Sequence, residues 1–485
     1  MADSVNAAGL PDQLSAVDYL LHRGEANPRT RSGILSLEIL DTTPDWERFR
    51  ATFEAASRKA LRLREKVVVP TLPTAAPRWV VDPDFTIDYH VRRIRVPEPG
   101  TLREVLDQAE LLLQAPLDIS RPLWTATLVE GLADGRAATL IHLSHAVTDG
   151  VGGVEMFSQL YDLERDPPPK PLAPMPIPRD LSADDLMREG INRLPLTVAG
   201  GVFGTVSNAM RIAGRIAGDP VSAASGAFDY ARSSLRMMQQ AAKPSPLLLR
   251  RSLASRTEAL DIVLADLHRA AKAAGGSIND AYLAGLCGAL RRYHAALGVP
   301  VATLPMAVPV NLRTGSDPAG GNRFTGVNLA APIAVTDPAE RIRRIRAQMT
   351  QRREERALGL LGAIAPLLSV LPTPTLESLE ERVIAADVQA SNIPMYPGET
   401  YIAGAKVLRQ YGLGPLPGVA MMVVLLSRDG VCTISVRYDR AAITDAELFA
   451  RCLHEGFDEV LALAGDPAPH SVPASFTSLA ATEGP

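Results

Sequence analysis

The chain has 485 residues, of which 46% are hydrophobic and 21% are charged, the mixture of an ordinary globular protein. This composition excludes a disordered, collagen-like or disulfide-rich class. Basic and acidic side chains nearly balance, 50 against 54, so the charge gives no reason to expect a nucleic-acid partner. The three cysteines lie far apart, which predicts neither a disulfide framework nor a zinc site, and a reducing cytoplasm is the expected compartment.

Neither a secretory leader nor a membrane-spanning helix is expected from the sequence. The first 13 residues contain two acids and no basic stretch followed by an apolar core. Residues 194–210 come nearest to a spanning segment because they are uncharged, but a proline and several glycines interrupt them. The length predicts two or three domains.

Strand and helix signals alternate in the first third of the chain. Residues 33–40 are strand-like, and Thr43-Pro44-Asp45 has the hydroxyl, proline and acid typical of a helix start. Thr101 and Glu104 have the spacing of a capping box, which predicts a helix through Leu113. Further strands are expected at residues 85–96, 124–129 and 137–143.

A proline-rich stretch separates two halves of the chain. Residues 166–179 contain seven prolines, which lack an N–H and fix φ, so an extended connection is expected. Residues 180–250 are rich in alanine, glycine and serine and predict a helical crossover. We therefore divide the chain into an N-terminal half, a linker with the crossover, a C-terminal half and a flexible tail, which are residues 1–166, 167–255, 256–465 and 466–485.

The alternation of strands and helices returns in the C-terminal half. Capping patterns predict helix starts at residues 277–280, 337–340 and 444–447. Strands are expected at residues 418–426 and 431–438. The whole pattern predicts an α/β fold made of two similar halves.

The stretch most informative about chemistry is residues 140–154, LIHLSHAVTDGVGGV. A strand runs into His145, a turn follows at Asp149 and Gly150, and glycines lead into a helix from about Gly153. A histidine at a strand end can project into a cleft, and its pKa of about 6.5 makes the neutral ring a general base near pH 7. The positive end of the following helix would disfavour an imidazolium there. Asp149 could fix this geometry by pairing with a distant arginine.

The motif by itself leaves a structural alternative open. His145 could instead satisfy hydrogen bonds in a core, with Asp149 and Gly150 forming an ordinary turn. A metal site is not predicted, because His142 and His145 are three residues apart on a strand and should point to opposite faces.

The surrounding sequence resembles a known family. SHAVTDG at residues 144–150 is similar to the HHxxxDG motif of CoA-dependent acyltransferases, and the chain looks like a bacterial wax ester synthase/diacylglycerol acyltransferase. Further similar blocks occur in the order of that family, and together they cover roughly residues 14–465. They are LSAVD at 14–18, PRWVVDPDFTIDYHVRR at 77–93, PLDISRPLW at 116–124, SINDAYLAGLCGALRRY at 277–293, VPVNLR at 308–313, GNRF at 321–324 and SNIPMYPGETYIAGAKV at 391–407.

This resemblance implies two domains like those of chloramphenicol acetyltransferase, forming a pseudo-dimer around a substrate tunnel. It implies acyl transfer from acyl-CoA to the hydroxyl of diacylglycerol or a long-chain alcohol, giving triacylglycerol or wax ester. No metal, bound cofactor or covalent acyl-enzyme is implied. His145 would take the proton of the acceptor hydroxyl, while Asp149, with Gly150 beside it, would orient the site. By analogy with related condensation domains, Arg313 would be the arginine partner of Asp149.

The chain departs from the family pattern at Ser144, where the motif has its first histidine. Related acyltransferases carry only HxxxD, and Ser144 should face away from His145, so activity is expected to survive. The change alters a supporting group beside the base, which makes Ser144 a candidate for influencing the choice of acceptor.

Four residues in the similar blocks are further candidates for substrate binding, each with a structural alternative. Asn279 follows a capping position and fits a helix start as well as a substrate contact. Trp124 is expected near the acyl group by resemblance, but it also fits a strand-edge core. Ser391 and Asn392 could donate hydrogen bonds to the thioester oxyanion, or they could simply form a turn before Pro394.

The remaining expectations concern partners and competing functions. Seven arginines between residues 341 and 356 could contact CoA phosphates or anionic lipid, or they could form a solvated helix face. A hydrophobic product suggests peripheral contact with a membrane or lipid droplets, with residues 194–210 as one candidate. The alternatives are the same fold acting on a small alcohol or amine, and an acyl-CoA- or lipid-binding protein without turnover. The presence of His145, Asp149 and Gly150 argues against a mere binder.

Overall fold

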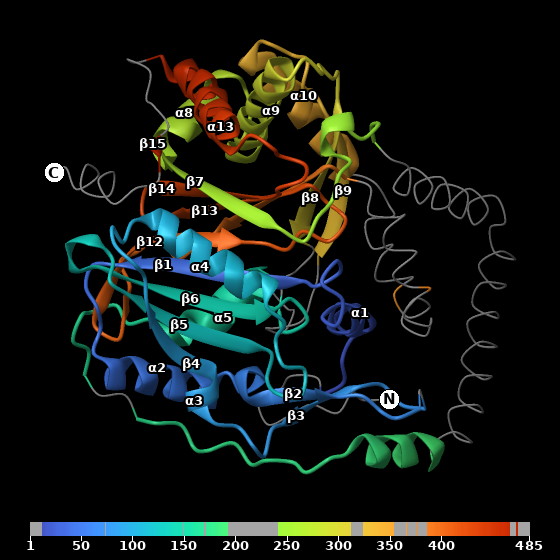
Figure 1. Cartoon of the computed structure of the whole chain (residues 1–485), viewed down its shortest axis with the longest axis vertical. Helices are drawn as coiled ribbons and strands as arrows, with labels where there is room; N and C mark the ends of the chain where they lie inside the picture. Colours follow the sequence, from blue (N-terminus) through green and yellow to red (C-terminus); the bar gives the residue numbers. More distant parts are fainter. Residues whose placement is uncertain are drawn as a thin grey trace, which may run out of the picture.

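The computed structural model describes residues 12–72, 74–148, 150–168, 171–192, 241–311, 324–353, 365, 375, 386–465 and 472–473. Two β-sheets form the centre of these parts, and helices cover them (Figure 1). One helix, α4 (Leu102–Gln114), lies between the sheets and contacts strands of both. This mixed architecture confirms the predicted α/β class.

The first sheet has six strands in the order β11-β12-β1-β6-β5-β4. Its neighbouring strands are antiparallel except β4 and β5, which are parallel. The members are β1 (Gly33–Leu40), β4 (Val91–Arg95), β5 (Trp124–Glu130), β6 (Ala137–Ser144), β11 (Tyr401–Ile402) and β12 (Ala405–Leu413). A separate two-stranded ribbon consists of β2 (Glu65–Val68) and β3 (Arg78–Val81).

Alternation along β1 supplies a core on each face of the first sheet, as expected for a strand covered on both sides. Leu37 packs in the core that includes α4, whereas Leu40 packs in the core that includes α2 (Trp46–Lys59). Thr101 and Glu104 form the predicted capping box, which satisfies backbone N–H groups at the start of α4. The sequence periodicity therefore predicted the strands and helix of this layer well.

The second sheet has seven strands in the order β15-β7-β14-β13-β10-β8-β9. One of its faces is covered by α8 (Leu264–Ala273), α9 (Ile278–Ala296), α10 (Pro338–Arg353) and α13 (Ala446–Leu461), and the largest core fills the space between (Figure 1). The strands are β7 (Ser255–Val263), β8 (Leu304–Asn311), β9 (Phe324–Ala331), β10 (Val388–Pro394), β13 (Met421–Arg428), β14 (Val431–Asp439) and β15 (Val472–Pro473).

Glycines allow α9 and α13 to approach closely. A Cβ atom at Gly456 would lie 2.3 Å from the backbone nitrogen of Ala289, and one at Gly285 would lie 2.6 Å from the ring of Phe457. Any side chain at these positions would push the helices apart. The glycines of the 277–293 block therefore serve helix packing.

The strand β12 joins the two halves. It hydrogen bonds with β1 of the first sheet, although it follows β10 of the second sheet along the chain. Thr433, Ser435 and Arg437 of β14 donate hydrogen bonds to the carbonyl oxygens of Gln410, Gly412 and Gly414, in that order. Side chains of β14 on the inner face of the second sheet thus hydrogen bond to β12 of the first sheet and to the residue that follows it.

A buried ion pair adds to this junction. Arg437 Nε lies 3.1 and 3.2 Å from the two carboxylate oxygens of Glu110 on α4, and both side chains are almost fully buried. The hydroxyls of Ser255 and Thr257 on β7 also donate to this carboxylate. A buried charge is tolerated when it is paired and hydrogen-bonded in this way.

Some sequence predictions need correction. Residues 85–96 were predicted as one strand, but Ile87–His90 forms the short helix α3 before β4 begins. The helix α3 brings the ring of His90 between those of Phe85 and Trp124, whose centroids lie 4.9 and 4.6 Å from the His90 centroid. Packing of this ring in the core outweighs the local strand pattern.

Two predicted helix starts are displaced by one or two residues. The N-caps are Asp45 and Asp445 instead of Thr43 and Thr444, because these carboxylates accept the backbone N–H three residues further on. The start at residue 337 is confirmed, with the Asp337 side chain accepting two backbone N–H groups of α10.

The predicted domain limits also differ from the sheets in two places. Residues 256–465 do not form one sheet, because β11 and β12 belong to the first. Residues 466–485 were assigned to a tail, but β15 pairs with β7. Most of the predicted crossover lies outside the described residues, including residues 194–210. Among the described residues, no helix is both long and apolar enough to cross a membrane.

Candidate active site

The predicted catalytic histidine lies immediately after β6, in a turn that leads to the helix α5 (Gly150–Phe157). This helix begins at Gly150, three residues before the predicted position. The His145 backbone N–H donates to the carbonyl oxygen of Ser32, 3.1 Å away, and its side chain is half-buried. Asp149 lies outside the described residues. The strand, turn and helix order predicted for this segment is therefore present, with His145 at its centre.

Ser144 faces a buried carboxyl group. Its Oγ donates to Glu25 Oε1 at 2.6 Å and accepts from the Ala146 backbone N–H at 3.2 Å. Because Ser144 is fully buried, its hydroxyl is occupied within the protein. Ser144 therefore supports the turn from within the protein core.

Glu25 is a site residue that the sequence analysis missed. It directly follows α1 (Ala16–Gly24) and is only 2% exposed. Burial raises the pKa of its carboxyl, and hydrogen bonds from Ser144 and Ser32 oppose this effect. Because 119 residues separate Glu25 from Ser144, no local spacing could have indicated the contact.

His142 lies on the same strand as Ser144 and is also buried. Burial lowers the pKa of its ring to about 3, so the ring is neutral near pH 7. A Cβ at Gly33 would lie 2.7 Å from His142 Nε2, and Leu113 of α4 lies nearby. His142 therefore packs against the α4 side of the sheet, where glycine at residue 33 leaves room for it.

Trp124 supports the strand that carries the histidine turn. It lies opposite Leu143 across the β5–β6 ladder and is fully buried. Its indole N–H donates to the carbonyl oxygen of Leu63 at 2.7 Å, and its ring stacks on that of His90. These contacts agree with the core alternative for Trp124.

Ser391 and Asn392 lie within β10, so the turn alternative for them is wrong. Ser391 pairs with Val424 of β13, which belongs to an apolar cluster facing β12. Successive residues of a strand point to opposite faces, so Asn392 points to the other side of the sheet. Only Ser391 can therefore face the first half.

The second sheet opens beside Ser391. Within the described strands, β10 pairs with β8 only at Val388 and Gln389, whereas it pairs with β13 along its whole length. Backbone groups of β10 beyond Gln389 therefore have no ladder partner on the β8 side. The unpaired stretch of β10 therefore includes Ser391.

One other predicted site residue, Asn279, is not brought to the histidine turn. Asn279 lies in the first turn of α9, between the capping-box residues Ser277 and Asp280, and α9 belongs to the helix layer over the far face of the second sheet (Figure 1). This placement agrees with the helix-start alternative. Arg313 lies outside the described residues.

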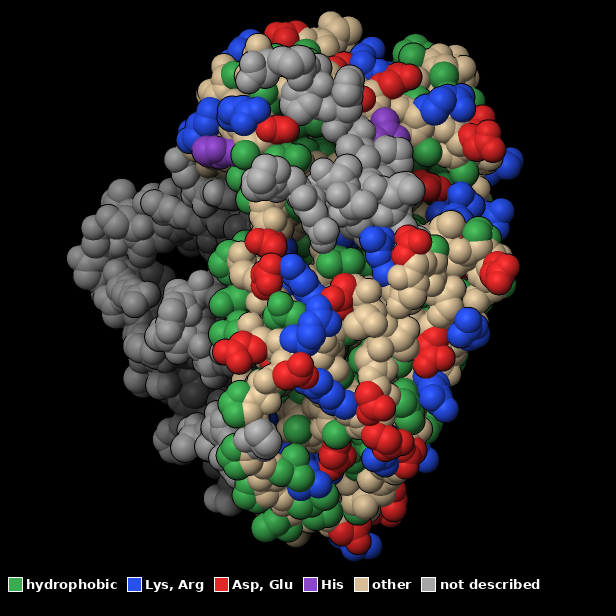
Figure 2. Space-filling view, turned by 90° about the vertical axis from the view of Figure 1, so that its left-hand side faces the viewer, with side chains coloured by type: hydrophobic (Ala, Val, Ile, Leu, Met, Phe, Trp, Pro, Cys, Tyr) green, Lys and Arg blue, Asp and Glu red, His purple; other side chains and the backbone are tan. Residues whose placement is uncertain are grey.

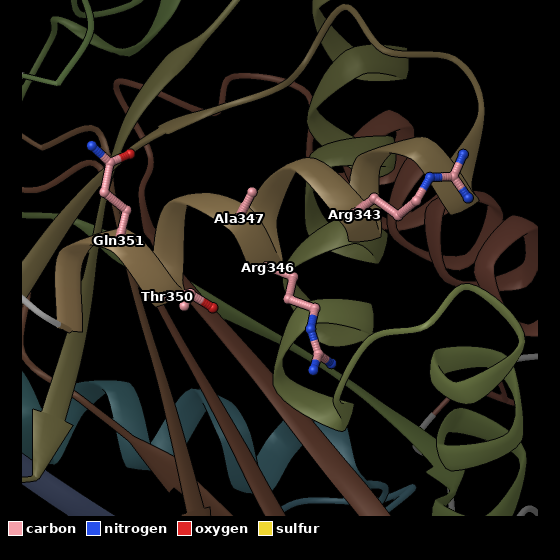
Figure 3. Close-up of a pocket in the computed structure, with 5 residues that line it drawn as sticks. All are labelled: Arg343, Arg346, Ala347, Thr350 and Gln351. Atoms are coloured by element: carbon pink, nitrogen blue, oxygen red, sulfur yellow. The ribbon is translucent and has the colours of Figure 1, made fainter.

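The arginine-rich helix α10 is largely engaged within the protein. Arg341 is fully buried and forms an ion pair with Glu459, while Arg343 and Arg344 pair with Glu340. A surface hollow of about 440 Å³ lies along this helix (Figure 3). It is lined by Arg343, Arg346, Ala347, Thr350 and Gln351. Most of the described arginines here thus support a structural or solvated role.

Family models match most of the chain. The model described as the wax ester synthase/diacylglycerol acyltransferase catalytic domain matches residues 9–282, and the model of the WS/DGAT C-terminal domain matches residues 320–460. A Mycobacterium tuberculosis H37Rv protein, provisionally named a diacylglycerol O-acyltransferase, is 70% identical. The match covers 98% of this chain and 97% of that protein.

Solved structures show the same fold at low sequence identity. The wax ester synthase/diacylglycerol acyltransferase from Marinobacter aquaeolei VT8 is 20% identical with a TM-score of 0.60, covering 93% of this chain and 100% of that one. A starter condensation domain of rhizomide synthetase, in complex with C8-CoA and Leu-SNAC, is 13% identical with a TM-score of 0.55 and 95% coverage of both chains. These matches confirm the predicted architecture of two linked acyltransferase-like halves.

Proposed function

Because the chain belongs to the wax ester synthase/diacylglycerol acyltransferase family, we propose that it transfers a fatty acyl group from acyl-CoA to the hydroxyl of diacylglycerol or a long-chain alcohol. The family assignment makes it an acyl-CoA-dependent acyltransferase. The acceptor and the role of each residue are the proposed part.

His145 is the general base in this proposal. As the acceptor oxygen attacks the thioester carbonyl, His145 takes its proton, and the resulting tetrahedral intermediate then expels CoA. The same imidazolium returns the proton to the leaving thiolate, so the ring is neutral again after each turnover. The observation that carries this role is the turn after β6, which anchors the His145 backbone at Ser32 and leads directly into α5.

Ser391 is the candidate donor to the oxyanion of that intermediate. It faces the first half from a strand whose pairing with β8 ends at Gln389. A donor aimed at developing negative charge typically contributes roughly 3–4 kcal/mol to the barrier. Asn392, which points to the opposite face, is not part of this role.

Acyl-CoA is the donor that best fits the fold. The condensation domain with the same architecture is a complex with C8-CoA, which supports an acyl-CoA as the donor. No bound cofactor or metal is proposed for this chain. Among the described residues, no group of three potential ligands lies close enough to hold a metal ion.

The test is CoA release from palmitoyl-CoA by purified protein with hexadecanol or dipalmitoylglycerol. His145→Ala should lower acceptor-dependent release by at least about a hundredfold. The matched control is His268→Ala, an exposed histidine on α8, which should keep wild-type release. Release that is unchanged in His145→Ala would reject the general-base role.

The choice of acceptor follows from the same assay. Faster release with dipalmitoylglycerol would identify a diacylglycerol acyltransferase, and faster release with hexadecanol a wax ester synthase. Release only with a small alcohol or amine would favour the alternative acceptor class. A protein that binds palmitoyl-CoA and releases no CoA with any acceptor would be a binding protein.

Peripheral contact with lipid is a further part of the proposal. The extended proline-rich segment carries three exposed apolar side chains, Leu172, Met175 and Ile177. It runs along the lower end of the molecule in Figure 1, where Figure 2 also shows hydrophobic side chains gathered. Such side chains can insert into a lipid surface without a membrane-spanning helix.

This contact can be tested by flotation with phosphatidylcholine/phosphatidylglycerol vesicles. The double variant Leu172→Ser/Ile177→Ser should float less than the wild type. Leu111→Ser, at an exposed leucine of α4, is the matched control. Equal flotation of all three proteins would reject the segment as the contact.

A further inference from the structure

The carboxyl group of Glu25 connects two chain segments that meet at the histidine turn. Its Oε1 accepts from Ser144 Oγ at 2.6 Å and from Ser32 Oγ at 3.2 Å. Ser144 ends β6, and Ser32 immediately precedes β1, which pairs with β6. Glu25 belongs to neither strand, so it reaches this pair of strands from the end of α1.

Each serine in turn fixes a backbone N–H group of the turn. The Ser32 carbonyl oxygen accepts from the N–H of His145 at 3.1 Å. The Ser144 hydroxyl accepts from the N–H of Ala146 at 3.2 Å, so the hydroxyl hydrogen is directed to Glu25. Two consecutive peptide groups, those of His145 and Ala146, are therefore held by residues that share one carboxyl group.

The direction of these hydrogen bonds requires an acceptor at position 25. Ser144 uses its oxygen as the acceptor for Ala146 and must donate its proton elsewhere. Glu25 Oε1 supplies that acceptor. An apolar residue would leave the buried Ser144 hydroxyl without an acceptor, which is unfavourable for a buried polar group.

Burying the Glu25 carboxylate costs free energy, because the charged group loses its contact with water. This cost argues that a carboxyl group at residue 25 has a role besides stabilising the fold. The side chain is only 2% exposed, and its Oε2 has no hydrogen-bond partner among the described residues. Arg31 is the charged neighbour that partly compensates by its attraction to the carboxyl group.

We propose that Glu25 is a positioning residue for His145, acting through Ser144 and Ser32 to hold the backbone of the turn. This inference rests on the proposed role of His145. It explains how serine can stand at residue 144, because a short hydroxyl side chain meets a carboxyl that comes close enough to hold it. Loss of the carboxyl should displace the imidazole without removing it.

The experiment compares kcat and KM for palmitoyl-CoA in Glu25→Ala, Glu25→Gln and Ser144→Ala. Glu25→Ala should lower kcat about 10- to 100-fold with KM changed by less than about threefold, because a misplaced base slows the chemical step more than binding. Ser144→Ala should give a smaller loss in the same direction. Glu25→Gln should recover most of kcat, because its amide oxygen still accepts from both serines.

A matched control separates positioning from general destabilisation. Glu38 on β1 is another buried carboxyl, fully inaccessible and hydrogen-bonded to Gln410 and Tyr161 instead of the histidine turn. Glu38→Ala should lower the unfolding temperature at least as much as Glu25→Ala while keeping kcat within about threefold of the wild type. Kinetics are measured at a temperature where all variants are folded by circular dichroism.

The outcomes are distinguishable from a failure of the proposed function. If His145→Ala keeps its activity, the general-base role fails, whatever Glu25 does. If His145→Ala is inactive but Glu25→Ala has wild-type kcat, the positioning role is wrong. The same conclusion follows if Glu25→Ala and Glu38→Ala lose kcat equally, because generic destabilisation would then explain both.

Discussion

The two halves of the molecule share a plan, a sheet covered by helices, but they bury different side chains around their key elements. In the first half, β6 ends among the buried polar residues Glu25, His142 and Ser144. In the second half, α9 buries mostly apolar side chains and glycines, and its charged contacts gather in one cluster, where Arg291, Arg292 and the buried Arg341 pair with Glu459. The buried polar groups of the first half therefore lie beside the histidine turn, whereas the buried ion cluster of the second half joins helices to one another.

The junction of the halves contains both apolar contacts and buried hydrogen bonds. An apolar cluster of β13 contacts Gly412 of β12 and the following Gly414, while β14 donates hydrogen bonds to carbonyl groups of β12. Rigid attachment matters because a site between two halves keeps its geometry only if the halves do not move. Three predictions test the contrast between the halves and their junction, in order of decreasing effect.

The largest effect is expected at the junction. Glu110→Ala removes the partner of Arg437 and leaves a buried guanidinium unpaired, which should lower the free energy of unfolding by about 3–5 kcal/mol. Urea denaturation followed by circular dichroism measures it. The double variant Glu110→Ala/Arg437→Met should recover part of the loss. A loss below about 1 kcal/mol in the single variant would show that the ion pair does not hold the halves together.

An intermediate effect is expected from acid, and it tests the buried polar residues of the first half. The folded pKa of His142 is about 3, whereas an unfolded histidine titrates near 6.5. As the pH falls below 6.5, His142 binds a proton in the unfolded chain but stays neutral in the folded protein. The free energy of unfolding therefore declines until about pH 3. Between pH 7 and pH 5 this amounts to about 2 kcal/mol.

The measurement is urea denaturation of wild type and His142→Leu at both pH values. The variant should lose about 2 kcal/mol less than the wild type on going from pH 7 to pH 5. The comparison cancels carboxyl groups such as Glu25 and Glu38, whose raised pKa values act in the opposite direction. Between pH 8 and pH 7.5 the two proteins should change almost equally. Parallel losses down to pH 5 would mean that the ring is protonated in the folded protein.

The smallest effect tests a feature that the halves share. Thr101→Ala on α4 and Ser277→Ala on α9 each remove a capping-box hydroxyl, and each should lower the free energy of unfolding by about 1 kcal/mol. Thermal and urea unfolding measure both. Thr101→Ser should keep nearly full stability. A loss confined to one of the two helices would show that the helices do not depend equally on their caps.

Local sequence patterns predicted much of the fold. The strand β1 was predicted with its observed ends, and β5 and β6 each extend one residue beyond the prediction. Both capping boxes are present because their hydrogen bonds join residues only three positions apart. Helix starts that depend on competing caps, as at Asp45 and Asp445, were displaced, since neighbouring polar residues could serve equally well.

The candidate site was predicted less completely. The sequence placed His145 correctly at the end of a strand, but it grouped Ser391 with Asn392 although a strand turns them to opposite faces. Trp124 and Asn279 were recognised as motif residues, while their contacts belong to the core and to a helix start. A sequence motif identifies residues shared with a family, but it does not specify whether those residues contact the substrate.

The sequence by itself determined β1, β5, β6, the two capping boxes and the histidine turn, because these depend on periodicity and on hydrogen bonds between near neighbours. Only the tertiary structure decided that Glu25 supports Ser144 and that Gln410 of β12 contacts Glu38 of β1. These pairs are 119 and 372 residues apart. Contacts over such separations arise from the packing of whole sheets and helices, and no local pattern encodes them.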